Sequence, residues 1–216
     1  MPIPFQFEPA LVTEAPLSVG LRLTVEGPGR LRLTSSAGLL PDAYLQGIND
    51  VATHYEWWDD QTAELITVAL DGALVIRNHL GWRPFAKLGL NVEAGYGFVG
   101  LGGGITGSEV LSIVTGYDIP DEVGGGLSFS ANAVLHMADV TLGWDQALWK
   151  RLHLRVDLGA AFTLASQTTI EPDFEVAPLA EGFVDELCTR GEEALDEEFQ
   201  TYVHLPTAAV SLGWRF

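Results

Sequence analysis

Polar and apolar residues alternate with a period of two in seven segments of the chain. Successive side chains of an extended strand point to opposite sides, so each segment has one apolar and one polar face. The segments span residues 19–25, 31–34, 65–80, 86–98, 127–144, 152–164 and 206–216. In the last segment the apolar face consists of Ala208, Val210, Leu212, Trp214 and Phe216. The alternation predicts seven β-strands whose two faces meet different surroundings.

Strand length bears on whether the apolar faces meet lipid or a protein core. Hydrophobic residues make up 47% of the sequence, yet no run reaches the roughly 18 consecutive apolar residues that a membrane-spanning helix needs. A membrane role would require a closed barrel, because an open sheet edge leaves backbone groups unpaired in hydrocarbon. Strands of ten or more residues favour this barrel, since soluble strands average about five or six. Alternation alone also allows a soluble, lipocalin-like barrel with its apolar face inside.

The chain ends on Trp214-Arg215-Phe216. This closing strand resembles the C-terminal signal strand of bacterial outer-membrane β-barrel proteins, in which assembly machinery reads the terminal aromatic residue. The resemblance implies a location in the bacterial outer membrane, contact with membrane lipid and lipopolysaccharide, and the barrel-assembly machinery as a partner. The segment at Met1 has neither the basic stretch nor the apolar core of a secretory signal, so we expect the chain to be the mature part.

An even number of strands is usual in such barrels, so one more strand is needed. Residues 3–12, with Phe5 and Phe7 alternating, are the candidate, although three prolines in the first nine residues weaken the segment as a strand. We therefore predict one all-β domain over residues 1–216. Its fold is an antiparallel up-and-down transmembrane β-barrel of about eight strands.

The connections alternate in length, as in a barrel with short turns on the inner side and long loops on the outer side of the membrane. The short connections are predicted at residues 27–29, 81–84 and 145–151, and the long ones at 41–64, 100–126 and 171–200. Two of these extracellular loops are expected to contain short helices. The helices are predicted over residues 43–54, capped by Asp42, and over residues 181–199, with a break near Gly191.

Charged residues in the polar register are expected to point into the barrel. The main candidates are Arg22, Arg32, Asp71, Arg77, Lys87, Glu93, Arg155 and Asp157, with Glu26 and Arg215 beside them. Their signs nearly balance, and buried charges persist only when they are paired. An eight-stranded barrel is just wide enough for side chains to fill it. We expect a plugged interior with an ion-pair network in place of an open pore.

The outer loops are strongly acidic. Of the 29 acidic residues 21 lie in the three long connections, whereas of the 11 basic residues only Arg190 does. Such a surface serves solubility, and its carboxylates also suit divalent cations such as calcium, although no EF-hand spacing is present. The sequence therefore does not decide whether the loops bind a metal ion. The net charge of −18 disfavours nucleic acid. Trp57 and Trp58, next to two aspartates, are candidates for surface recognition.

No motif points to catalysis or to a cofactor. Gly95–Gly100 fits the dinucleotide glycine pattern, but no strand-turn-helix unit surrounds it. Cys188 is interpreted as a bystander, and the histidines lack metal-binding spacing. A lipid-modifying enzyme would need a serine or carboxylate beside a lipid-facing histidine. His136 is instead predicted to face the interior with Ser130 and Asn132, opposite Leu135 and Met137, before a bulge near Ala138 switches the register.

The function that these patterns favour is structural or partner-binding, through acidic surface loops on a plugged monomeric barrel. The alternatives are a narrow channel or transporter, a lipid-modifying outer-membrane enzyme, and the soluble barrel named above.

Overall fold

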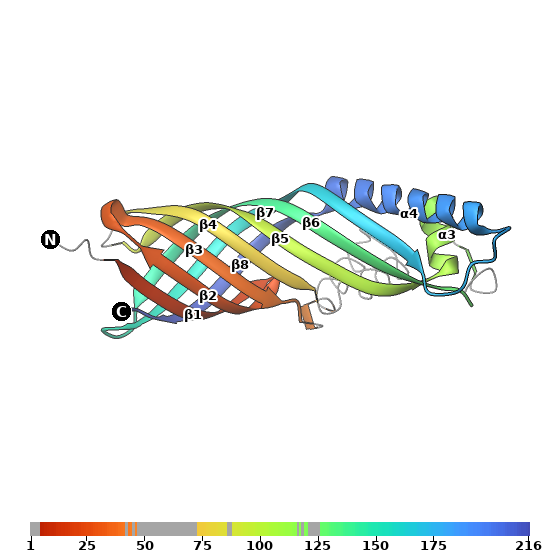
Figure 1. Ribbon diagram of the computed structural model, residues 1–216. Coiled ribbons are helices and arrows are strands. Elements are labelled where there is room, and N and C mark those ends of the chain that lie inside the picture. Colours follow the sequence, from red (N-terminus) through yellow and green to blue (C-terminus); the bar gives the residue numbers. More distant parts are fainter. Residues whose placement is uncertain are drawn as a thin grey trace.

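The chain folds as a closed barrel of eight antiparallel strands in the order β1 to β8 (Figure 1). The computed structural model describes residues 5–41, 43–44, 46, 73–85, 88–115, 117, 119–120 and 126–216. The strands are β1 (Gln6–Ala15), β2 (Ser18–Glu26), β3 (Leu31–Leu39), β4 (Leu74–Phe85), β5 (Leu90–Thr106), β6 (Ser128–Ala147), β7 (Leu152–Pro172) and β8 (His204–Trp214). The helices are the 3-10 turn η1 (Pro28–Arg30), α3 (Gly107–Thr115) and α4 (Glu181–Tyr202). The predicted fold class is confirmed.

The eighth strand is β1, which closes the barrel by pairing with both β2 and β8. It lies about three residues later than predicted. Pro9 pairs opposite Leu23 of β2, whereas the ladder with β8 begins only at Ala10. Proline is tolerated at position 9 because its missing N–H would face β8, and β8 does not pair with β1 at this position. The start of β1 and the C-terminus lie at one end of the barrel, which we call the terminal end (Figure 1).

The turn predicted at residues 81–84 is wrong, because β4 continues through Phe85. The pairing with β5 is irregular between Trp82 and Phe85. Pro84 therefore lies in a bulge, one of the few places in a sheet where a missing N–H costs little. The connection to β5 comes later, and it includes Gly89 at φ 69°, a left-handed conformation that suits glycine.

The predicted facing of the first half of β6 is also wrong. Leu135 and Met137 are buried inside, and His136 lies on the outer wall. Pairing with β5 is continuous from Ser128 to Trp144, so β6 itself has no bulge at Ala138. The irregularity is on β7, where Leu164 has no opposite residue between Ala165 and Thr163. The alternation was assigned to the wrong faces because the interior changes from polar to apolar along this strand.

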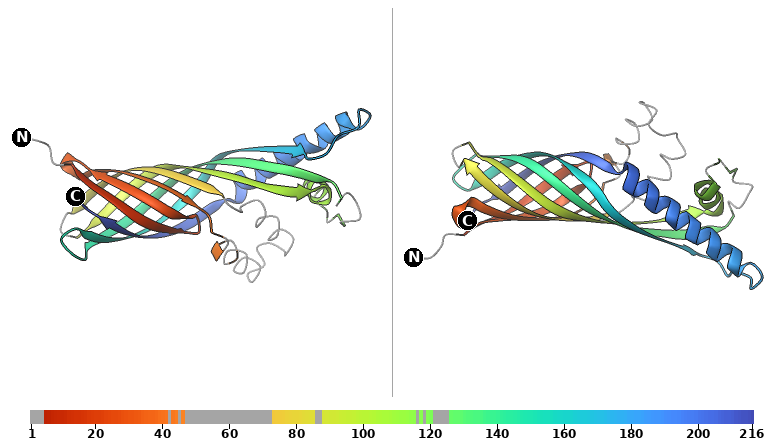
Figure 2. Two further views of the ribbon diagram at one scale, coloured as in Figure 1. Left: turned by 60° about the horizontal axis from the view of Figure 1, so that its bottom comes forward. Right: turned by 90° about the horizontal axis from the view of Figure 1, so that it is seen from above.

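The long loop predicted at residues 100–126 is shorter than expected, because β5 continues through Thr106. Strands β5, β6 and β7 project beyond the barrel (Figure 2). The β4 ladder on β5 ends at Gly100 and the β8 ladder on β7 ends at Phe162, whereas β5–β6 pairing reaches Thr106 and β6–β7 pairing reaches Pro172. We call the projecting strands, together with α3 and α4, the extension. It marks the loop end of the barrel, opposite the termini.

Helix α4 takes the place of a partner strand along the free edge of β7. The Glu192 carboxylate accepts the Ile170 backbone N–H at 2.8 Å, and the Thr168 hydroxyl donates to Asp196 at 2.7 Å. The predicted break near Gly191 is wrong: the helix is continuous, and Gly191 lies where an added Cβ would be 2.9 Å from Ile170 Cδ1. The glycine is there for close packing. No helix among the described residues is both long and apolar enough to cross a membrane.

Helix α3 begins with a capping box. The Thr106 hydroxyl accepts the Glu109 N–H at 3.3 Å, and the Glu109 carboxylate in turn accepts the Thr106 N–H. Two backbone donors at the start of the helix are satisfied reciprocally in this way. The helix predicted over residues 43–54 lies largely outside the described residues.

Candidate functional site

The interior of the barrel has two layers of opposite character. At the loop end the inward side chains form a buried apolar cluster, which we call the apolar layer. It consists of Leu17, Leu40, Ala73, Val75, Val99, Leu101, Ala133, Leu135, Met137 and Ala161. Phe199, Val203 and Leu205, from the end of α4 and the start of β8, pack against it. The described side chains therefore fill this end of the barrel with hydrocarbon.

Toward the terminal end the same inward register carries arginines and carboxylates, which we call the ion-paired layer. Arg22 bridges Glu14 at 2.7 Å and Asp157 at 2.6 Å. Arg155 bridges Asp157 at 2.7 Å and Glu93 at 2.9 Å. Each guanidinium thus serves two carboxylates on different strands, an arrangement that its planar fork of five donors suits.

The layer continues in both directions as one chain of contacts. Toward the apolar layer, Arg77 joins Glu14 at 3.0 Å to Asp139 at 3.2 Å, and Asp139 also contacts the His79 ring. Toward the termini, Arg32 lies 3.4 Å from Glu93. All of these side chains are buried. Removing either partner of such a pair leaves an uncompensated buried charge, so the groups are mutually dependent.

The last links of the chain lie at the terminal end. Asp145 lies 3.6 Å from Arg32, accepts from His153 Nδ1 at 2.8 Å, and shares the Arg215 guanidinium with Glu8. Glu8, Asp145 and His153 could present three ligand atoms within 4.8 Å of one another. The Arg215 cation already lies against both carboxylates, however, and a metal ion would have to compete with it.

The structure brings together six of the eight interior residues predicted from sequence. Asp71 and Lys87 lie outside the described residues, as do Trp57 and Trp58. Sequence reasoning missed four acids of the network, namely Glu8, Glu14, Asp139 and Asp145. The alternation in the first strand could have indicated two of them, because Glu8 and Glu14 lie on the face opposite Phe5 and Phe7. The predicted partner Glu26 instead pairs with Arg83.

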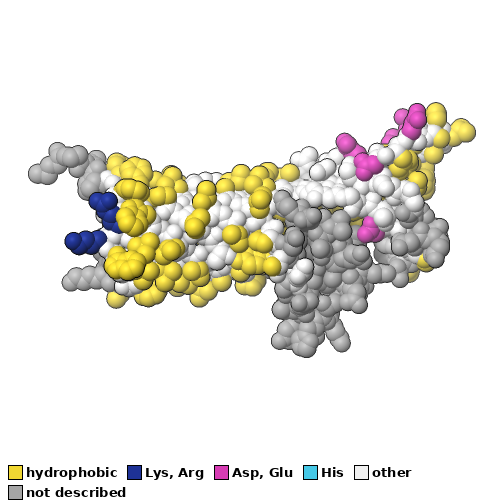
Figure 3. Space-filling model, turned by 90° about the horizontal axis from the view of Figure 1, so that it is seen from below, with side chains coloured by type: hydrophobic (Ala, Val, Ile, Leu, Met, Phe, Trp, Pro, Cys, Tyr) yellow, Lys and Arg dark blue, Asp and Glu magenta, His cyan; other side chains and the backbone are white. Residues whose placement is uncertain are grey.

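Exposed apolar side chains from all eight strands form an apolar belt on the outer wall, and Figure 3 shows one face of it. On β7 the outward residues from Leu152 to Phe162 are almost all aliphatic or aromatic. Ten residue steps of about 3.3 Å, tilted by about 40°, give a height of roughly 25 Å, the height of the apolar band of a transmembrane barrel. Beyond Leu164 the outward side chains become polar, including Gln167, Thr169 and Glu171.

Aromatic side chains lie at both edges of this belt, as expected of interfacial girdles. Toward the terminal end the exposed aromatics are Phe5, Phe7, Trp82, Phe85, Trp144, Trp149, Trp214 and Phe216. At the other edge Tyr96 hydrogen-bonds through its hydroxyl with His136 Nδ1, and Phe98 meets the same ring edge-on. The prediction that His136 faces the interior is therefore wrong. Its neighbours on the outer wall are aromatic.

Exposed charge is divided between the two ends of the molecule (Figure 3). The short turns at the terminal end carry exposed Arg30, Lys150 and Arg151. The extension is acidic: over residues 171–200 the sequence has eleven acids and one base, Arg190, which pairs with Glu186 at 2.7 Å. Cys188 faces the core of the extension, and burial there, with Glu192 and Asp185 nearby, raises the pKa of its thiol.

Comparisons with known proteins give similar solved structures and no family. No protein-family model matches the chain, and no curated protein sequence matches it. Among solved structures it is similar to a major outer membrane protein from Thermus thermophilus, at 16% identity and TM-score 0.49 over 98% of both chains. It is also similar to Acinetobacter baumannii CarO2, at 11% identity and TM-score 0.43 over 98% of both chains. For Acinetobacter baumannii CarO the identity is 12% and the TM-score 0.40 over 97% of both chains.

Proposed function

We propose that the protein is a monomeric barrel of the bacterial outer membrane that does not conduct and that acts through its acidic extension, as a structural or partner-binding surface protein. The apolar belt carries the membrane assignment. A soluble barrel of this kind would bury its apolar face, whereas here Leu11, Leu21 and Leu80 are each at least 65% exposed on the outer wall. The ionised side chains instead lie inside.

In this proposal the short basic turns face the periplasm and the extension faces outward, so Phe216 finishes on the periplasmic side, where the barrel-assembly machinery would read it. The belt contacts lipid and the extension lies at the height of lipopolysaccharide. Divalent cations that bridge the acidic surface to that anionic layer remain part of the proposal.

The test of the membrane assignment is migration on a gel in detergent, with and without boiling. We expect a compact, faster band before boiling and an unfolded band after it, because the barrel resists dodecyl sulfate until heated. Folding to the same circular dichroism spectrum in buffer without detergent would contradict the assignment.

The packing of the interior leads to a separate expectation for transport. A narrow channel is favoured by the polar character of the ion-paired layer, but the apolar layer lies across the same axis and offers ions no polar partners. We expect no conductance steps when the purified barrel is inserted in a planar bilayer. Steps that persist across preparations would favour the channel.

An enzyme is favoured by one observation, the place of His136 on the outer wall. Its hydrogen-bond partner among the described residues is the Tyr96 hydroxyl, and neither a serine nor a carboxylate takes the role that acyl transfer would require. We expect mass spectrometry of lipopolysaccharide incubated with the folded protein to show no change. A product that disappears in the His136→Phe variant would support the enzyme.

A further inference from the structure

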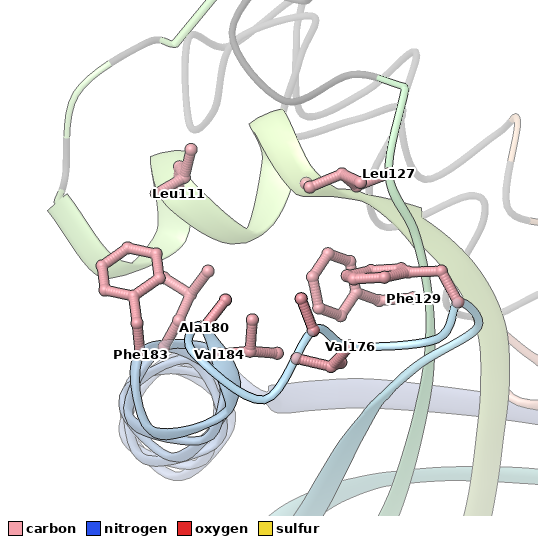
Figure 4. Close-up of a pocket in the computed structure, with 11 residues that line it drawn as sticks. Leu111, Leu127, Phe129, Val176, Ala180, Phe183 and Val184 are labelled. Carbon is pink, nitrogen blue, oxygen red and sulfur yellow. The ribbon is translucent and has the colours of Figure 1, made fainter.

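The extension encloses an apolar pocket between α3, the start of α4 and the segment that follows β7 (Figure 4). Its volume is about 280 Å³. Leu111 of α3 lies on one side, Phe183 and Val184 of α4 on the other, and Phe129 and Val176 lie at one end. The lining is almost wholly hydrocarbon, so the pocket would take an apolar group and offers nothing to orient a polar one.

The size of the pocket limits what this group can be. Pockets for drug-sized ligands span roughly 300–1,000 Å³, so a cavity of about 280 Å³ suits one large side chain or a short alkyl group. Phe183, at the mouth, is 67% exposed. Exposed aromatic residues beside a pocket are common where a partner inserts an apolar anchor.

The charge around the pocket indicates which class of molecule could insert the apolar group. Glu175, Glu181 and Asp185 are exposed and adjoin lining residues in the sequence. The one base nearby, Arg190, is already paired with Glu186. A fatty acid or a phosphate-bearing lipid would be repelled from this rim, whereas a cationic molecule would be attracted.

The acidic residues extend well beyond the pocket, because exposed acids continue along α4 to Glu198. A helix of 22 residues is about 33 Å long at about 1.5 Å per residue. A small amine could meet only a fraction of this row. A peptide segment could meet most of it.

We propose that the extension binds a basic peptide segment that inserts one large apolar side chain between α3 and α4. This inference rests on the proposed function, since it names the class of partner for the same acidic extension. Lysines or arginines of the segment would lie along the acidic face of α4, and the anchor would fill the pocket.

The test uses the full chain in nanodiscs of zwitterionic phosphatidylcholine, with empty nanodiscs as the background. The probe is a short fluorescent peptide with lysines on either side of one tryptophan. Two companions replace the tryptophan by serine or the lysines by glutamate. We expect the serine peptide to bind at least about tenfold more weakly, because burial of an aromatic side chain is lost, and the glutamate peptide not to bind.

The pocket is tested from the protein side by two substitutions. Phe183→Ser removes an exposed lining side chain, and Ala180→Phe would fill the cavity. Each is expected to weaken the tryptophan peptide about tenfold and to leave the serine peptide unchanged. Tyr117→Ser is the matched control, since Tyr117 is 76% exposed and does not line the pocket, and it should bind as the unchanged protein does.

The rim is tested by two pairs of neutralising substitutions. Glu181→Gln with Asp185→Asn lies at the pocket, and Glu197→Gln with Glu198→Gln lies at the far end of α4. Because charges are screened over about 8 Å at physiological salt, the first pair should weaken a short peptide more than the second. Binding should also fall as salt is raised.

Three results would overturn the inference: equal binding of the serine peptide, equal binding of the glutamate peptide, or unchanged affinity in Phe183→Ser. The same nanodisc preparation is examined for heat-modifiable migration. If the barrel passes that assay and the peptide fails to bind, the peptide inference alone falls. If the barrel does not insert, the proposed function falls and the inference falls with it.

Discussion

The two layers inside the barrel fill the same kind of space with opposite chemistry. The ion-paired layer holds its strands together through guanidinium groups that each reach two carboxylates. The apolar layer does so through close packing of aliphatic side chains. The ion pairs depend on charge, on geometry and on the presence of each partner, whereas the aliphatic packing depends mainly on side-chain volume. The comparison implies that the two layers tolerate different substitutions.

The largest effect is expected from removing one guanidinium. Arg155→Met removes one of the two cations beside each of Glu93 and Asp157, so that only Arg32 and Arg22 stay close to them. Breaking buried ion pairs of this kind costs about 3–5 kcal/mol of unfolding free energy. Urea unfolding in detergent, followed by tryptophan fluorescence, measures the loss. Adding Glu93→Gln to the same variant should restore part of it. A loss below about 1 kcal/mol would mean that the network is solvated and not buried.

In the apolar layer a cavity is expected to cost somewhat less. Leu135→Ala removes a buried side chain and should lower the free energy of unfolding by about 3 kcal/mol, within the range for leucine truncation in cores. The same urea titration reports it. An effect under about 0.5 kcal/mol would indicate that the apolar layer is loosely packed, and the expectation of a sealed interior would weaken with it.

Conservative exchanges should separate the layers most clearly. Arg155→Lys keeps the charge but not the fork that reaches two carboxylates, so we expect a loss of about 1.5–3 kcal/mol. Leu135→Met keeps the volume and should cost less than about 1.5 kcal/mol. Thermal midpoints of the two proteins in one detergent provide the measurement. If Arg155→Lys lowered the thermal midpoint no more than Leu135→Met does, directional pairing would not be what stabilises the ion-paired layer.

The smallest effect is expected for an exposed ion pair that serves as the reference. Arg190→Met breaks the contact with Glu186 on the surface of α4, and surface pairs of this spacing contribute about 0.3–0.5 kcal/mol. The urea midpoint should therefore shift by little, and raised salt should remove the difference. A shift as large as that of Arg155→Met would show that burial is not what distinguishes the network.

The division into layers also explains which features could be predicted from sequence. Strands with one chemistry on each face, such as β2 and β8, were located closely, because exposed apolar and buried polar residues alternate regularly there. Only the first four residues of β3 were found, because the alternation weakens at Ser35 and Ser36. The first half of β6 was misread because Leu135 and Met137 are apolar and yet point inward. A one-dimensional pattern does not reveal that the inward surroundings change along the barrel axis.

Two other errors have local causes. Pro84 was taken as the end of a strand, but a bulge accommodates it within β4. Gly191 was taken as a helix break, but it allows the close approach of α4 to Ile170. In both cases the residue type carries the right signal of special backbone or packing, and the choice between interpretations depends on tertiary contacts that lie far away in sequence. The network acids Asp139 and Asp145 likewise became recognisable only when strands distant in sequence were paired.

The position of α4 along the edge of β7 has a consequence for the protein among its neighbours. Proteins confined to a membrane plane meet at high local density and in fixed orientation, so an uncovered strand edge that projected from each copy would face its equivalents repeatedly. Backbone groups exposed in that way can pair from one molecule to the next and grow into aggregates. Glu192 accepts the Ile170 N–H and Asp196 accepts the Thr168 hydroxyl, so α4 covers this edge of β7. A neighbouring copy therefore meets a charged helix in place of an open strand edge. Repulsion between like charges keeps the copies apart.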